Sequence, residues 1–72
     1  MREPLSIDLL LDGRAHAVAE GTTLAVLVDT LGHAPEKVTT AVNGLFVPRG
    51  ERPARVLQPG DAVLLFQPIV GG

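Results

Sequence analysis

The sequence predicts an α+β fold in which a mixed sheet of four to five strands packs against one main helix on one face. Three observations predict it. Residues 5–11 largely alternate between apolar and polar side chains, as a half-buried strand does. Residues 23–31 carry apolar side chains at helical spacing, and residues 62–66 form a short continuous apolar segment. The chain has 72 residues, which is the size of one small domain.

The first two strands are expected to form a hairpin over residues 5–11 and 14–19. The pair Asp12-Gly13 between them accepts the positive φ angles of a type I′ turn. A turn of two residues sets Leu9 opposite His16 and Ile7 opposite Val18, so both strands contribute to one buried face. The side chains of the first strand expected on that face are Leu5, Ile7, Leu9 and Leu11.

A helix is expected after the hairpin, over residues 23–31, with Thr22 as its N-cap. Gly32 suits the left-handed position that follows a helix, and Pro35 prevents the helix from resuming. The apolar stripe that should face the sheet consists of Leu24, Leu27, Val28 and Leu31.

Two short strands follow the helix. Residues 38–42 are rich in β-branched side chains, and Asn43-Gly44 is a second pair suited to a primed turn. Residues 45–47 continue as a strand, which Pro48 ends or confines to a sheet edge. The polar residues 49–55 are expected to form a loop.

The last strand, residues 62–66, is apolar on both faces, which indicates a position in the middle of the sheet. We expect it to lie beside the first strand and parallel to it, with the helix crossing one face of the sheet. This order of elements predicts a ubiquitin-like β-grasp fold over residues 1–67. Residues 68–72 are then expected to form a flexible tail that ends in Gly-Gly.

Composition argues against several classes of protein. The net charge is −2 and no basic stripe with stacking aromatics is present, so we expect no nucleic-acid partner. The chain has no cysteine, and His16 and His33 lack neighbours at metal-ligand spacing, so we expect no metal site. The longest apolar run is too short to span a bilayer, and residues 1–4 do not resemble a signal peptide. We therefore expect a soluble, cytoplasmic protein.

No catalytic constellation is apparent either. Ser6 lies within a strand with no histidine that can be placed beside it, and turns or helix ends account for the internal glycines. A chain this short cannot enclose a sizeable pocket. We expect neither an independent enzyme nor a bound cofactor.

The end of the chain is the remaining candidate site. Residues 68–72 can extend about 17 Å, which is enough to enter a cleft of another protein. Gly71 has no Cβ, so it gives the Gly72 carboxylate access to a narrow channel. That carboxylate must be activated, for example as an acyl-adenylate, before a sulfur nucleophile can attack it. Ile69 and Val70 are expected to anchor the tail through apolar contacts with a partner.

Three segments resemble the sulfur carrier proteins of thiamine (thiazole) biosynthesis, a ubiquitin-like family related to the small subunit of molybdopterin synthase. They are Asn43 to Arg49, Gly60 to Gln67, and Ile69 to Gly72, and the opening of the helix, Gly21 to Leu24, is also similar. The first segment indicates the thiamine carrier. The second segment and the Gly-Gly end are shared with the molybdopterin synthase subunit and other carriers.

The resemblance implies a mechanism and a set of partners. An E1-like adenylyltransferase would use ATP to adenylate the Gly72 carboxylate. Sulfur from a cysteine desulfurase or a rhodanese-type donor would then displace AMP and leave a thiocarboxylate. Thiazole synthase would take this sulfur into the thiazole ring, so the chain would be a cosubstrate and not a catalyst.

Other interpretations remain open at this stage. The chain could carry sulfur for another pathway, such as molybdopterin or a thioacid-dependent biosynthesis, with the same chemistry at Gly72. It could be a protein modifier that forms an isopeptide through Gly72, or a β-grasp binding module with an inert tail. Outside the tail, we expect partners to contact Arg49 and the sheet face away from the helix.

Overall fold

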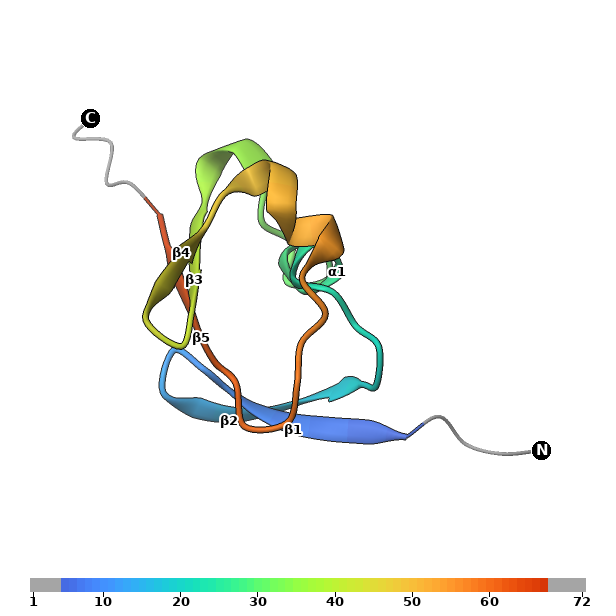
Figure 1. Ribbon diagram of the computed structural model, residues 1–72. Helices are drawn as coiled ribbons and strands as arrows, with labels where there is room; N and C mark the ends of the chain where they lie inside the picture. Colours follow the sequence, from blue (N-terminus) through green and yellow to red (C-terminus); the bar gives the residue numbers. More distant parts are fainter. Residues whose placement is uncertain (1–4, 68–72) are drawn as a thin grey trace.

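The computed structural model describes residues 5–67, and these form one five-stranded sheet with a helix on one face (Figure 1). The strand order is β2-β1-β5-β3-β4. The elements are β1 (Ser6–Leu11), β2 (Arg14–Ala19), α1 (Leu24–Thr30), η1 (Pro35–Lys37), β3 (Thr39–Val42), β4 (Leu45–Val47), η2 (Arg49–Ala54) and β5 (Ala62–Phe66). The predicted mixed sheet with one main helix is confirmed.

The first hairpin has the predicted register, with Leu9 opposite His16 and Ile7 opposite Val18. Asp12 and Gly13 have φ angles of 50° and 84°, as a type I′ turn requires. Asn43 and its following glycine have φ angles of 53° and 83°, so the second hairpin turns in the same way. Leu5 departs from the prediction: it precedes β1 and is exposed.

The helix begins one residue later than predicted, with Thr23 and not Thr22 as the N-cap. The Thr23 hydroxyl accepts a hydrogen bond from the Val26 N–H at 3.2 Å. The Thr22 hydroxyl instead donates to the Ala19 carbonyl at 2.6 Å, which ties it to the end of β2. Gly32 follows the helix with a φ of 83°, as predicted.

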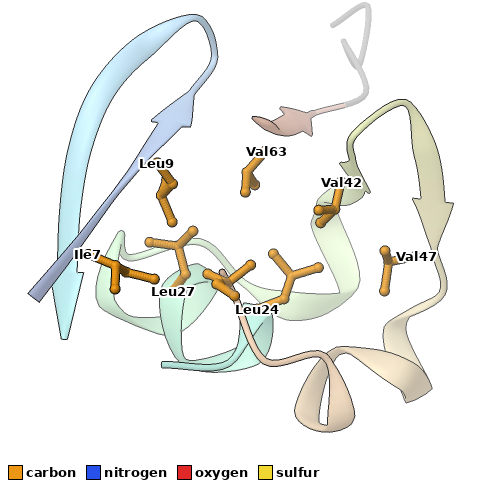
Figure 2. Packing of buried hydrophobic residues seen from close by; sticks show 8 residues of the cluster. Ile7, Leu9, Leu24, Leu27, Val42, Val47 and Val63 are labelled. Atoms are coloured by element: carbon orange, nitrogen blue, oxygen red, sulfur yellow. The ribbon is translucent and has the colours of Figure 1, made fainter. Parts of the chain in front are cut away.

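Strand β5 occupies the predicted place, parallel to β1 on one side and antiparallel to β3 on the other. The core lies between this sheet and α1, where side chains from β1, β3 and β5 converge on Leu24 and Leu27 (Figure 2). Only one face of β5 is covered, as expected for a sheet with a helix on one face. Val63 is fully buried, whereas Leu64 and Phe66 are 37% and 52% exposed on the opposite face.

The segment predicted as a loop, residues 49–55, contains a 3-10 helix. This element, η2, packs beside α1 on the same side of the sheet (Figure 1). Its Arg52 is only 4% exposed and donates hydrogen bonds into the interior. A polar composition indicated solvent exposure, but the guanidinium finds backbone and hydroxyl acceptors that allow the segment to fold inward.

Candidate functional site

The residues predicted to react or to anchor the tail, Ile69, Val70, Gly71 and Gly72, lie outside the described residues. The structure does describe the strand that leads to them. β5 pairs with β1 only at Ala62 and Val63, whereas its pairing with β3 runs from Val63 to Phe66. β3 is therefore the strand that accompanies β5 to its end.

Side chains fix β5 at its start. Asp61, which is buried, accepts a hydrogen bond from Asn43 Nδ2 at 3.0 Å and another from the Gln58 N–H at 2.8 Å. The Asn43 side-chain oxygen accepts from the Ala62 N–H at 2.9 Å. Further along the strand, the Asp12 carboxylate accepts from the Leu65 N–H at 3.1 Å. Both hairpin turns thus hold β5 in register.

The side chain of Gln67, the last described residue, also makes a contact. Gln67 Nε2 lies 2.7 Å from His33 Nδ1, in the segment that follows α1. This contact links the end of β5 to the end of the helix. It involves two polar side chains at the surface.

The sheet face away from α1 carries a row of exposed apolar side chains, which we call the outer face: Leu10, Phe46, Leu64 and Phe66. The strand pairing brings them together, since Ala41 lies opposite both Leu64 and Phe46. Leu10 pairs with Ala62 at the start of the same strand. Large exposed apolar patches of this kind mark surfaces that bind other proteins.

Arg49 lies elsewhere. It is exposed at the start of η2 and lines a hollow with residues of α1, on the side of the sheet opposite to the outer face. The structure therefore does not bring together the two surfaces expected to contact partners. A partner that touches both would have to reach around the β3–β4 edge of the sheet.

Arg52 lines the same hollow and was not anticipated. Its Nε donates to the Thr40 hydroxyl at 3.0 Å, and its Nη atoms donate to the carbonyls of Pro35 and Val38. Burial lowers the pKa of Arg52, and the nearby Arg49 charge lowers that pKa further. The sequence offers no signal for this role, because an arginine within a polar segment is ordinarily solvated.

The described part of the chain holds no group of three or more histidine, cysteine, aspartate or glutamate side chains arranged to bind a metal ion. Within residues 5–67, no helix has the length and apolarity needed to cross a membrane.

Comparisons with known proteins agree with the predicted resemblance. The ThiS family model matches residues 9–72. The sulfur carrier protein ThiS of Escherichia coli is 33% identical over 66 residues, which are 92% of this chain and 100% of that protein. A thiazole synthase of Magnetococcus marinus is 44% identical over 62 residues, which are 86% of this chain, and the chain spans 19% of the length of that relative.

Solved structures show the same fold. The crystal structure of the thiamine biosynthesis protein ThiS from Geobacter metallireducens superposes with a TM-score of 0.79 at 29% identity, covering 92% of this chain and 100% of that one. The solution structure of the Geobacter protein gives a TM-score of 0.78 at 30% identity, covering 92% of this chain and 88% of that one. The family match spans most of the chain, so the chain belongs to the ThiS family, and it is a sulfur carrier protein of thiamine biosynthesis and not itself a catalyst.

Proposed function

We propose that the chain carries sulfur as a thiocarboxylate on Gly72 and delivers it for the formation of a thiazole ring. One observation carries this proposal. The family match extends through residue 72, and the E. coli sulfur carrier aligns over its whole length, so the Gly71-Gly72 end falls within the part of the chain that the relatives share.

The chemistry follows from the functional groups that the chain offers. Without cysteine, the chain has no side-chain thiol that could bear sulfur. A carboxylate needs a better leaving group before sulfur can attack it, and an E1-like adenylyltransferase supplies one by transferring AMP from ATP to Gly72. The terminal sulfur of a persulfide on a cysteine desulfurase or a rhodanese-type donor attacks the carbonyl carbon. The C–S bond forms, AMP leaves, and an acyl disulfide joins Gly72 to the donor cysteine. A thiol, which is the reductant of this step, then attacks the donor cysteine sulfur: the S–S bond breaks, the Gly72 thiocarboxylate leaves, and a new disulfide joins the thiol to the donor cysteine.

Thiazole synthase is the proposed recipient. The Magnetococcus relative of that name shares a 62-residue segment with this chain. A carrier-like segment within a relative named thiazole synthase favours an encounter of this domain with that enzyme. In this scheme residues 1–67 act as the domain that partners hold, and residues 68–72 act as the tail that enters their sites.

The outer face is the proposed docking surface for the adenylyltransferase. Phe66 belongs to this face and lies two residues before the tail begins at Pro68. An enzyme that binds the face is therefore placed to receive the tail, since residues 68–72 can extend about 17 Å. Ile69 and Val70 add apolar contact along that path, and Gly71 leaves the reacting carbonyl unobstructed.

A reconstitution with purified proteins tests the choice of pathway. The thiocarboxylate form is supplied to thiazole synthase as the sole source of sulfur, and the thiazole product is measured by mass spectrometry. We expect one equivalent of product per carrier and recovery of the unmodified chain. No product with thiazole synthase, together with sulfur transfer to the large subunit of molybdopterin synthase, would instead assign the carrier to that pathway.

A further inference from the structure

A hollow of about 230 Å³ lies between α1 and η2, apart from the outer face. Its walls are mostly apolar, with Ala25 and Val28 from the helix and Pro35 and Pro53 from the two 3-10 elements. Two arginines, Arg49 and Arg52, also line it. The hollow is smaller than a typical cofactor or drug-sized site, and its size suits a single side chain.

Within residues 5–67, no carboxylate forms an ion pair with Arg52. The acceptors of its hydrogen bonds are the Thr40 hydroxyl and two backbone carbonyls, all of which are uncharged. Three N–H groups are used in these bonds, whereas a guanidinium carries five. The residue is only 4% exposed, so little water contacts it directly.

Arg49 adds a second positive charge to the same hollow. Two like charges that face one space repel each other, and the effect of Arg49 on Arg52 has this sign. An anion placed between them would relieve the repulsion and would meet donors from both groups. The chain as a whole carries a net charge of −2, so this positive feature is local.

We propose that this hollow binds one carboxylate group, carried by a glutamate or aspartate side chain of a partner protein. The guanidinium groups of Arg49 and Arg52 bind the oxygens, and the apolar walls contact the methylene stem. A protein partner as occupant rests on the proposed function, because a carrier must bind the enzymes that load and unload it. The carboxylate site itself does not depend on sulfur chemistry.

The test is an NMR titration of the whole chain with N-acetyl-glutamate amide, followed through the amide signals of residues 25–28 and 49–53. N-acetyl-glutamine amide, which has the same shape without the charge, and inorganic phosphate are titrated in parallel. We expect saturable shifts with the glutamate compound that are confined to the hollow, and none with the glutamine compound. Absence of saturable shifts with the glutamate compound would overturn the proposal, and at least tenfold tighter binding of phosphate would overturn the carboxylate assignment.

Two variants make the result specific. Arg49→Gln removes the exposed charge, so it leaves the buried network in place and should weaken binding about fivefold. Arg14→Gln makes the same change in charge on the exposed edge strand β2, away from the hollow, and should leave binding unchanged. Equal effects of both variants would show non-specific attraction and overturn the site.

A second measurement on the same samples tests the proposed function independently of the carboxylate site. Conversion of Gly72 to the thiocarboxylate is measured by intact mass for the wild-type chain. A wild-type chain that takes up sulfur but shows no glutamate binding contradicts only the hollow. A chain that binds glutamate but takes up no sulfur contradicts only the carrier mechanism.

Discussion

A hydrogen bond between the side chains of Asn43 and Asp61 links the second hairpin turn to the start of the central strand β5. Asn43 Nδ2 donates to Asp61 Oδ1 at 3.0 Å, and the other atom of the amide accepts from the Ala62 N–H at 2.9 Å. The Asn43 side chain therefore supplies an acceptor for the Ala62 N–H, a backbone donor of β5. Because β5 precedes residue 68, this pair helps to fix the strand from which the proposed tail continues.

Asn43→Ala should lower the free energy of unfolding by about 2–4 kcal/mol. The substitution removes hydrogen bonds to a buried carboxylate and to a backbone N–H, and it forces an alanine into a left-handed φ of 53°. Urea denaturation measures the change. Asn43→Gly is the matched control, since it removes the same hydrogen bonds without the strain and should cost about 1–2 kcal/mol less. Equal costs for the two variants would show that backbone strain plays no part.

Thr40→Val should destabilise the fold by about 1–3 kcal/mol although it preserves shape. The Thr40 hydroxyl is fully buried, donates to the Val47 carbonyl at 2.9 Å and accepts from Arg52 Nε at 3.0 Å. Valine removes both of these hydrogen bonds and leaves the buried Arg52 Nε without this acceptor.

Thr39→Val is the control for that substitution. It makes the same change one residue earlier, at an exposed position opposite Phe66, and should change stability by less than about 0.5 kcal/mol. A tolerated Thr40→Val would mean that Arg52 is not held by this hydroxyl.

Phe66→Asp should weaken binding to the cognate adenylyltransferase about tenfold or more, because it places a charge within the apolar outer face. Val26→Asp is a matched control: Val26 is also 52% exposed but lies on the helix. Biolayer interferometry measures both affinities, and thermal denaturation verifies that both variants are folded. Similar losses for the two variants would contradict docking through the outer face.

Much of the fold could be predicted because its signals are local. Alternation of apolar residues, two primed-turn pairs and a left-handed glycine after the helix each act within a few residues, and all were confirmed. The exchange of roles between Thr22 and Thr23 could not be predicted, since either threonine can cap a helix. One tertiary and one local contact distinguish them: Thr23 forms a β-bridge with Val56, and the Thr22 hydroxyl donates to the Ala19 carbonyl three residues earlier.

Part of the candidate site could also be predicted, because the signal for the strand that leads to it is local. Apolar residues on both faces of 62–66 correctly indicated the central strand, but composition alone could not show that one of those faces stays open. The inward position of Arg52 depends on acceptors supplied by residues 12 to 17 positions away, which no local pattern reveals. The roles of Arg49 and of residues 69–72 stay predictions.

Intact-mass spectrometry of the chain, after incubation with ATP, the cognate adenylyltransferase and sulfide, tests the carrier mechanism most directly. We expect one oxygen to be replaced by sulfur in the wild-type chain. A variant that lacks Gly72 should show no replacement, because its carboxylate ends about 3.5 Å short of the reacting position. The core residues lie between Ile7 and Val63, so this variant should keep the melting temperature of the wild-type chain. An unchanged wild-type mass, or equal sulfur uptake by the variant, would contradict Gly72 as the carrying group.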